Sequence, residues 1–404
     1  MPDVPIQADL IPARAMPPAR RSALSWRSKQ ARGVIYQLVV MSLVAFLVWL
    51  LVSNTLANMQ ARGIQSGFDF LLQTAGFDIG EEITGYDSSQ PYWRAFLAGV
   101  GNTLRVAIIG VVLTTILGTL LGIGRFSRNA LVRAICYGYV ECFRNIPVLL
   151  QLLMWYLIFT EYLPSIDQAL TVGNLFFLSK NGVSFPFPVW SPGYLLALAG
   201  LLVGAVVAFV YARSARKAFD LTGQIRPVLW VSLVLLIAGT VVGWLAGGAP
   251  WQWMIPVKNE VQVEGGGALS PEYMALLIGL VLYTSAFVAE VVRGGIASVA
   301  AGQHEASASL GLPARLSMRL VILPQALRVI IPPMTNQFLN LTKNSSLAVA
   351  IGYPDVVSIA NTSLNQTGRA VECIVIIMAV YLTLSLITSA FMNWFNARAA
   401  IKER

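Results

Sequence analysis

The amino-acid sequence predicts an all-α polytopic membrane protein with about eight transmembrane helices. Of its 404 residues, 56% are hydrophobic and 12% are charged, whereas soluble globular proteins carry about 25% charged residues. Apolar runs of about 20 residues, the length that crosses a bilayer, recur along the chain. These observations argue against a chain of soluble domains, and the low charge excludes a disordered one.

Seven apolar runs are uninterrupted, and an eighth contains three prolines. The seven cover residues 36–57, 100–124, 134–159, 194–211, 228–245, 273–292 and 373–394. The eighth, 320–341, contains Pro324, Pro332 and Pro333, so we expect it to be kinked or broken. The first run follows a basic segment but is too long for a cleaved signal peptide, and we interpret it as an uncleaved signal anchor.

Lysine and arginine residues indicate the orientation of the chain. With the N-terminus inside, 20 of the 28 Lys and Arg residues fall on cytoplasmic segments and 6 on external ones. This bias follows the positive-inside rule, so both termini are expected in the cytoplasm. The rule also explains the net charge of +9, and no nucleic-acid partner is expected.

Three external stretches are long enough to fold by themselves. Residues 58–96 carry five acids and are expected to form a small cap or an interfacial helix. Residues 161–192 and 249–271 are rich in Pro, Gly and Trp. We interpret these two as lid and linker loops with Trp residues at the membrane interface.

Sequence motifs of catalysis are missing. There is no phosphate-binding loop of the G-x-x-x-x-G-K-[ST] type, so the chain is not expected to hydrolyse ATP. His304 and Glu305 begin like a zinc-protease motif, but position 308 is Ala and the chain has no second histidine. The three cysteines lie in apolar runs, where small buried thiols are the usual interpretation. No catalytic residue, metal site or cofactor is therefore expected.

The cytoplasmic segment before the eighth run predicts a short docking helix. Residues 300–310 are small helix formers, and Gly311 is a natural helix stop, with Pro313 two residues later. Glu305, on the first turns, would complement the helix dipole and remain available to a basic partner. An ordinary surface helix is the alternative that composition alone leaves open.

The same segment resembles the EAA loop of ABC-importer permeases, which inserts into a cleft of the ATPase subunit. Glu305-Ala306-Ser307 is followed by Gly311 and then by Leu323-Pro324. Ser307 replaces the usual Ala, a change between small residues that should not disturb docking. By this resemblance the coupling residues are Gly302, Glu305, Ala306, Ser307, Gly311, Leu323 and Pro324.

Four further segments are similar to the polar amino-acid branch of that family, which comprises histidine, glutamine and arginine importers. They are residues 141–151, 289–295, 323–328 and 343–347. The resemblance implies a type I ABC-importer permease core of five spans, with an extra N-terminal span and a two-span insertion. It is closest to the larger permease subunits of general L-amino-acid or glutamate/glutamine/aspartate/asparagine importers.

The resemblance also gives domain boundaries and partners. The expected segments are a basic tail (1–34), a signal-anchor span (35–57), an external loop (58–96), a permease core (97–396) and a cytoplasmic tail (397–404). The core contains the insertion at 192–248 and the coupling loop at 300–324. The implied partners are two ABC ATPase subunits, a second related permease subunit in a heterodimer, a periplasmic amino-acid-binding protein and an L-amino-acid substrate.

Four charged residues occur inside or at the ends of spans. Glu141 and Arg144 are three residues apart, and Glu290 and Arg293 repeat that spacing, so each pair is expected to meet on one helical face. Ionisable groups at bilayer depth usually face the interior of a bundle. Structural pairs near the interface and groups with a transport role both remain possible interpretations.

Two groups of polar residues are candidates for the substrate pathway. Arg105 lies near the external end of its span, after Asn102, with no acid nearby in sequence. Asn336, Gln337, Asn340 and Lys343 crowd the far end of the proline-containing run, where a broken helix can offer polar groups to a substrate. The alternative is that these groups only satisfy the broken helix.

The sequence therefore predicts a non-catalytic permease subunit that moves amino acids inward by alternating access, driven by a partner's ATP cycle. The competing interpretation is a stand-alone ion-coupled secondary transporter. That class would place coupling carboxylates near the middle of a span, whereas Glu141 and Glu290 are expected at helix ends. A secondary transporter also gives no reason for the EAA segment.

Overall fold

The structure is a computed structural model, and it describes residues 29–61, 63, 66–259 and 263–399. Most of the basic tail predicted at 1–34, and the last residues of the tail predicted at 397–404, lie outside the described residues. The chain divides into two units, residues 1–67 and 68–404. Each unit is described by itself below.

The first unit consists of one long helix, α1 (Lys29–Ala61). Its 33 residues correspond to about 50 Å at 1.5 Å per residue. It is long and apolar enough to cross a membrane, as predicted for residues 36–57.

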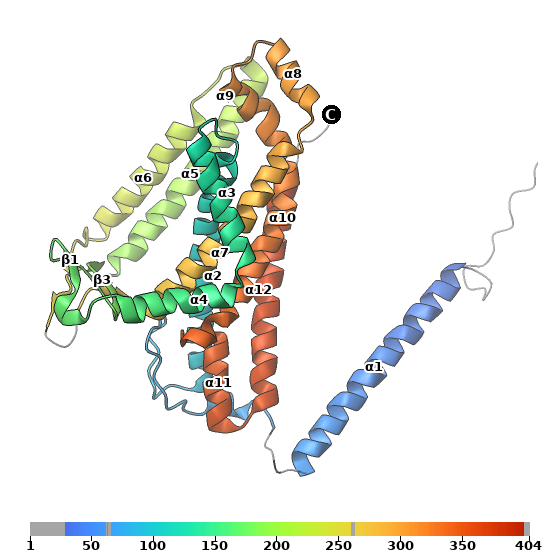
Figure 1. Ribbon diagram of the computed structural model, residues 1–404, viewed down its shortest axis with the longest axis vertical. Helices are drawn as coiled ribbons and strands as arrows, with labels where there is room; N and C mark the ends of the chain where they lie inside the picture. The colour runs from blue at the N-terminus through green and yellow to red at the C-terminus, as the bar shows by residue number, and fades with distance from the viewer. Residues whose placement is uncertain (1–28, 62, 64–65, 260–262, 400–404) are drawn as a thin grey trace, which may run out of the picture. The chain divides into compact units, whose positions relative to one another are not determined.

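The second unit is a bundle of long helices (Figure 1). The longer helices are α2 (Tyr92–Gly124), α3 (Ala130–Asn145), α4 (Val148–Leu157), α5 (Gly193–Thr222), α6 (Val228–Ala246), α7 (Pro271–Ala297), α10 (Leu323–Asn344), α11 (Val356–Thr367) and α12 (Ala370–Ala399). Two short helices, α8 (Ala301–Ser309) and α9 (Ala314–Ser317), lie between α7 and α10. Short 3₁₀ helices lie at Asp69–Leu72, Ile166–Gln168 and Ser345–Ile351, and π-helical turns lie at Ile158–Tyr162 and Met318–Ile322.

Helix α7 is the centre of this bundle and packs against α2, α3, α4 and α10. Two glycines of α2 let it approach closely. A Cβ at Gly118 would lie 2.5 Å from Val288, and one at Gly122 would lie 2.8 Å from the Ala289 carbonyl. The Gly-x-x-x-Gly spacing at 118–122 therefore serves close helix packing.

The apolar run at 134–159 is not one straight span. It forms α3 and α4, which meet at a bend of 103°. Pro147 lies between the two helices, and Gln151, 1% exposed, donates to the Phe143 and Ile146 carbonyls at 2.9 Å each. A buried side chain thus satisfies carbonyls that the break would leave unpaired, a partner that hydropathy does not reveal.

The run at 320–341, predicted to be kinked or broken, is not broken at Pro332 or Pro333. Helix α10 continues through Pro332 and Pro333, and Pro324 lies in its first turn, where proline is tolerated. Ile330, Ile331 and other apolar residues of α10 are buried in a core cluster with α7 and α12. We attribute the continuity of the helix to this packing, which offsets the hydrogen bonds lost at the prolines.

Six described helices are long and apolar enough to cross a membrane, or seven if the bent pair α3 and α4 is one span. All eight predicted runs fall on helices. Helix α10, in the run at 320–341, is not among the helices long and apolar enough to cross a membrane, alone or in a bent pair. It carries polar residues along one face.

The predicted insertion forms a hairpin of α5 and α6, which Figure 1 shows beside the rest of the bundle. The two helices pack mainly on each other. A Cβ at Gly200 would lie 2.2 Å from the Gly239 carbonyl, and one at Gly243 would lie 2.2 Å from the Leu196 carbonyl. Two glycine patterns predicted from spacing, at 200–204 and 243–247, thus bring these backbones together.

Short antiparallel strands replace two of the predicted loops and add β-structure to the all-α prediction. One sheet has the order β1-β2-β3-β8 and pairs Val183 with Leu269. Two ribbons pair β4 with β5 and β6 with β7. The strands are β1 (Leu170–Val172), β2 (Phe176–Ser179), β3 (Gly182–Phe185), β4 (Phe187–Pro188), β5 (Trp253–Met254), β6 (Val257–Lys258), β7 (Val263–Glu264) and β8 (Gly267–Leu269).

The described part of the stretch 58–96 that belongs to this unit packs as a cap on α2 and α11. Phe70 is buried against Tyr92, Phe96 and Ile359. Arg369, at the start of α12, pairs with Asp69 at 3.0 Å. The cap is thus tied to the bundle by apolar contacts and by charge.

Candidate functional site

The predicted docking helix is present as α8. Leu310 caps it, and Gly311 follows with φ +68°, a left-handed conformation that costs residues with a Cβ about 1–2 kcal/mol. A Cβ at Gly302 or Gly311 would meet no atom within 4 Å. The surface at both glycines is therefore open.

Ser307 does not face the open side of α8, and no sequence pattern indicated the contact that it makes. It is 4% exposed. Its Oγ donates to the His304 carbonyl at 2.8 Å and lies 2.6 Å from the Ser317 Oγ of α9. This contact fixes α8 against the chain that leads into α10, with a second hydrogen bond from Gln325 to Gln303 at 3.0 Å.

The remaining predicted coupling residues lie at or near the surface. Glu305 and Ala306 are exposed on α8, Leu323 is exposed at the start of α10, and Pro324 is half-buried. Glu305 is the fifth residue of α8, and the first turn contains no acid. The dipole benefit expected of Glu305 is therefore reduced, because that effect falls off beyond the first turn.

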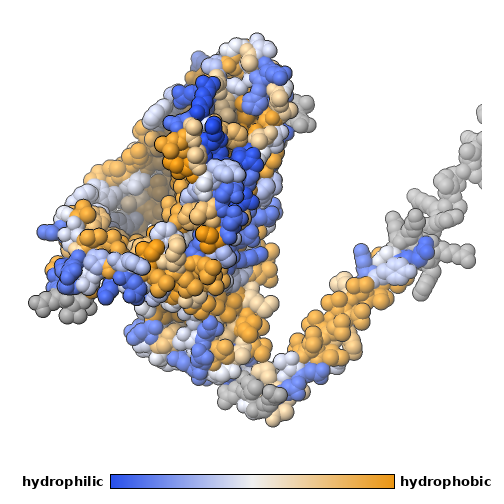
Figure 2. Space-filling model, in the orientation of Figure 1, coloured by the Kyte–Doolittle hydropathy of each residue, from blue (hydrophilic) through white to orange (hydrophobic). Residues whose placement is uncertain are grey.

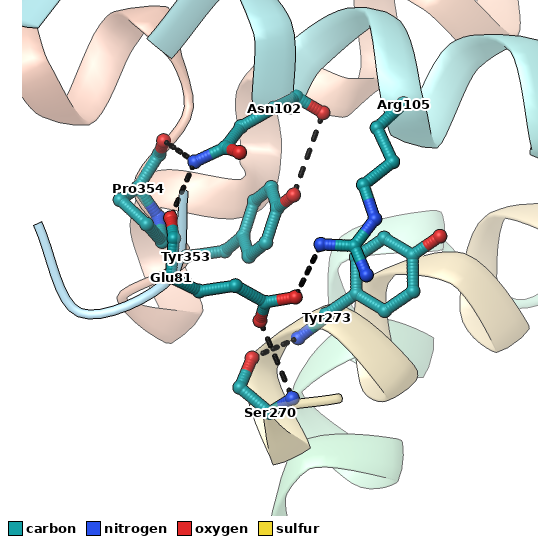
Figure 3. A network of polar contacts seen from close by, with 7 residues as sticks. All are labelled: Glu81, Asn102, Arg105, Ser270, Tyr273, Tyr353 and Pro354. Atoms are coloured by element: carbon teal, nitrogen blue, oxygen red, sulfur yellow. Dashed lines mark hydrogen bonds and ion pairs between the residues drawn. The ribbon is translucent and has the colours of Figure 1, made fainter. Parts of the chain in front are cut away.

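The predicted substrate residue Arg105 is already paired with a carboxylate (Figure 3). Its guanidinium binds Glu81 Oε1 at 2.5 Å and lies 4.1 Å from the centre of the Tyr273 ring. The other Glu81 oxygen accepts from the Ser270 backbone amide at 3.3 Å. The charge of Arg105 is thus neutralised by an acid of the cap, 24 residues earlier in the chain.

Asn102, the other residue of α2 predicted for the substrate pathway, is fully buried. Its Nδ2 donates to the Glu81 carbonyl at 2.7 Å and to the Pro354 carbonyl at 2.9 Å (Figure 3). The Tyr353 hydroxyl donates to the Asn102 carbonyl at 3.4 Å. Asn102 and Arg105 therefore fasten the cap and the segment before α11 to α2.

Asp355, beside this network, lies outside the candidate spans. It caps α11 by accepting from the Ser358 amide at 2.9 Å, and the Tyr381 hydroxyl donates to its second oxygen at 3.2 Å. Burial raises the pKa of Asp355 to about 6, because the charged form loses solvation.

Of the two predicted charge pairs, one forms and one does not. Arg293 binds Glu290 at 2.5 Å, as expected for an i, i+3 pair. Arg144 lies 4.0 Å from Glu290 and makes no ion pair with Glu141 in the described part of the chain. Arg125, at the end of α2, also pairs with Glu290. A distant arginine on α2 was not foreseeable from spacing.

A polar cavity of about 310 Å³ lies between α7 and α10. It is lined by Gln337 and Asn340, both predicted for the substrate pathway, and by Tyr283, Thr284, Phe287 and Asn344. Asn336 and Lys343 are exposed on α10 and do not line it. The Thr284 Oγ1 is buried and has no hydrogen-bond partner among the described residues. The described residues contain no cluster of three or more potential metal ligands.

Comparisons with known proteins agree with this architecture. The family described as "Binding-protein-dependent transport system inner membrane component" matches residues 200–401. The general L-amino acid transport system permease protein AapQ of Rhizobium johnstonii is 42% identical over 92% of this chain and 93% of its own. A putative amino-acid ABC transporter permease of Escherichia coli, YhdX, is 42% identical over 95% and 98%. The glutamate/glutamine/aspartate/asparagine transport system permease protein BztB of Rhodobacter capsulatus is 39% identical over 92% and 95%.

Proposed function

Because this chain belongs to the family of binding-protein-dependent transport system inner membrane components, we propose that it imports polar L-amino acids across the bacterial inner membrane. It is a permease subunit of an ABC importer. ATP hydrolysis belongs to a separate subunit, so the chain is neither an enzyme nor a stand-alone ion-coupled carrier.

The substrate class is supported by the relatives and by the cavity. AapQ is named for general L-amino acids, and BztB for glutamate, glutamine, aspartate and asparagine. The amide side chains of Gln337 and Asn340 line the cavity and offer both donors and acceptors to a polar amino acid.

Coupling to the ATPase is assigned to α8, and the geometry of this helix is the observation that carries the proposal. Glu305 and Ala306 are exposed, and Gly302 and Gly311 leave open space beside them. A protruding helix fixed at its base by Ser307 can transmit the movement of a bound subunit to α10 as a rigid element. Allostery requires such a contact to differ in energy between two states of the partner.

The assembly that fits this role contains four further subunits. ATPase and periplasmic binding-protein partners follow from the family. We propose two ATPase subunits and a heterodimer with a second related permease subunit. The amphipathic helices α3 and α10 expose polar residues, and a second permease that faced them would complete a polar passage shielded from lipid.

Reconstitution tests the proposal directly. The chain should be combined in proteoliposomes with its candidate permease partner, the ATPase and the binding protein. We expect L-amino acids to stimulate ATP hydrolysis and to accumulate inside only when ATP is present. Uptake driven by an ion gradient without the ATPase would overturn the proposal.

The orientation is proposed from charge, with both termini in the cytoplasm. The 20 to 6 distribution of Lys and Arg residues supports it. A reporter inserted within residues 249–259 should read external, and one at Gln224 should read internal. Internal signals at both sites would contradict the orientation of the α5–α6 hairpin.

A further inference from the structure

We propose that Glu141 and Arg144 on α3 bind the ammonium and carboxylate groups of the transported amino acid. The polar cavity between α7 and α10 would then receive its side chain. This inference rests on the proposed function and names the site at which that function recognises its substrate.

The first observation is an imbalance of charge around Glu290. One carboxylate is shared by three guanidinium groups, those of Arg125, Arg293 and Arg144. Arg125 and Arg293 are hydrogen-bonded to it. Arg144 is 4.0 Å away, beyond hydrogen-bond distance. Positive charge therefore remains on Arg144, whose side chain is 36% exposed.

The second observation is that Glu141 and Arg144 do not satisfy each other. Glu141 is exposed and forms no ion pair within the described ranges, although its spacing to Arg144 permits one. Charged groups at bilayer depth are costly unless they face a water-filled cavity or a partner. An acid and a base left apart on one helical face match the two opposite charges of an amino acid.

Helix α3 holds this face in a fixed position. The Tyr139 hydroxyl donates to the Leu282 carbonyl of α7 at 2.9 Å and lies 2.8 Å from the Ser285 Oγ. At the end of α3, Gln151 binds two carbonyls across the bend. The two charged side chains therefore project from a backbone that is anchored on both sides, which lowers the entropic cost of binding a ligand.

The third observation places Arg144 next to the polar cavity. Its guanidinium carbon lies 5.4 Å from the centre of the Phe287 ring, and Phe287 lines the cavity together with Gln337 and Asn340. The unpartnered Thr284 Oγ1, 2% exposed, lines the same cavity. Figure 2 shows hydrophilic residues in a band over α3 and α10 between hydrophobic surfaces.

The chemistry of these groups fits a zwitterion. A guanidinium offers a fork of N–H donors that matches a carboxylate with two parallel hydrogen bonds, and Glu141 can pair with the ammonium group. Gln337, Asn340 and Thr284 can exchange hydrogen bonds with different polar side chains, because amides and hydroxyls both donate and accept. Arg105, in contrast, already holds the Glu81 carboxylate.

The test uses the assembled permease–ATPase complex and the radiolabelled amino acid that most stimulates the wild-type importer. Arg144→Gln should weaken equilibrium binding at least tenfold, and Arg144→Lys should weaken it less. Competition by two analogues of that amino acid shows which side chain binds the carboxylate group and which binds the ammonium group. Arg144→Gln should lose the preference over the amide analogue, which lacks the carboxylate. Glu141→Gln should lose the preference over the analogue that lacks the ammonium group.

Arg133→Gln is the matched control, because Arg133 lies on the same helix and binds only the Ser127 carbonyl, at 3.3 Å. It should bind substrate like the wild type, and all variants should retain ATPase association. Equal binding by Arg144→Gln and Arg133→Gln, in an importer whose wild type accumulates amino acids, would overturn this inference and leave the proposed function standing. A wild type that accumulates no amino acid would instead overturn the proposed function.

Discussion

The two ends of the bundle are built in opposite ways. At one end, α8 exposes Glu305, and Gly311 ends the helix six residues later. At the other end, Glu81, Arg105 and Asn102 form a largely buried network with Ser270 and Pro354. The first end consists of one continuous segment with a free surface, and the second joins segments that are far apart in sequence. A surface that binds a partner must remain accessible, whereas a network that joins distant segments is stabilised by being buried.

The buried network and the group around Glu290 also differ in how their charges are paired. Arg105 has one acid, Glu81, and both side chains are less than one-fifth exposed. Glu290 has three arginines, and two of them, Arg144 and Arg293, are more than one-third exposed. The Arg105–Glu81 pair, with one charge of each sign, stabilises the fold. The group around Glu290 has an excess of positive charge that can bind a ligand. Four predictions test this contrast, in order of decreasing effect.

The largest effect is expected at the docking end. Glu305→Lys or Gly311→Asp should abolish ATP-driven uptake, because loss of about 1.4 kcal/mol already shifts docking tenfold. Thermal stability should change little for Glu305→Lys, because Glu305 is exposed. It should fall by about 1–2 kcal/mol for Gly311→Asp, because Gly311 has φ +68°. Uptake in proteoliposomes and co-purification of the ATPase measure the effect. Wild-type values in both assays would mean that α8 is an ordinary surface helix.

In the network of Glu81, Arg105 and Asn102, Glu81→Gln should lower the stability of the protein. It should affect transport less than Glu305→Lys does. Removing one partner of a buried ion pair costs about 3–5 kcal/mol, and partial exposure favours the lower end. Thermal unfolding in detergent is the measurement. The control is Glu82→Gln, because Glu82 binds only Thr84 on its own exposed loop. Equal melting temperatures for the two variants would contradict a structural role for Glu81.

Asp355 should make the external end sensitive to pH. Burial raises its pKa from 3.8 to about 6, so the folded state favours the protonated form. Its contribution to stability is fully present below about pH 4 and is lost as the pH rises through 6. The difference is at most about 3 kcal/mol. Melting temperatures at pH 4 to 7 should show this loss in the wild type and not in Asp355→Asn. Parallel curves for the two proteins would refute it.

The smallest effect is expected for Ser307→Ala. The variant loses the contact between α8 and α9, worth about 1 kcal/mol for a typical hydrogen bond, while the buried Ser317 hydroxyl loses that partner. Uptake should fall several-fold without being abolished, and ATPase co-purification should persist. Ser309→Ala is the control, because the Ser309 hydroxyl binds only the Glu305 carbonyl of its own helix. A loss as complete as that of Glu305→Lys would mean that Ser307 contacts the ATPase.

The helices and the docking segment could be predicted because their signals are local. Hydropathy located the long helices except α11, and Gly311 and Pro313 marked the end of α8. The β-strands were missed because two of the stretches that form them contain many Pro and Gly residues, and β3 pairs with β8, about 80 residues later in the chain. The effect of proline depends on its surroundings: Pro147 lies at a sharp bend, whereas Pro332 and Pro333 lie inside α10.

The sequence by itself determined that this protein carries several helices long enough to cross a membrane and a segment similar to the EAA loop, since apolar length and a contiguous motif need no knowledge of partners. Only the tertiary structure decided which charges are neutralised. Arg105 looked free because Glu81 is 24 residues away, and Arg144 looked paired because Glu141 is three residues away. In the fold, Arg105 is hydrogen-bonded to Glu81, whereas Arg144 lies 4.0 Å from Glu290 and makes no ion pair with Glu141 among the described residues. Electrostatic pairing depends on distance in space, which the packing of α2, α3 and α7 sets.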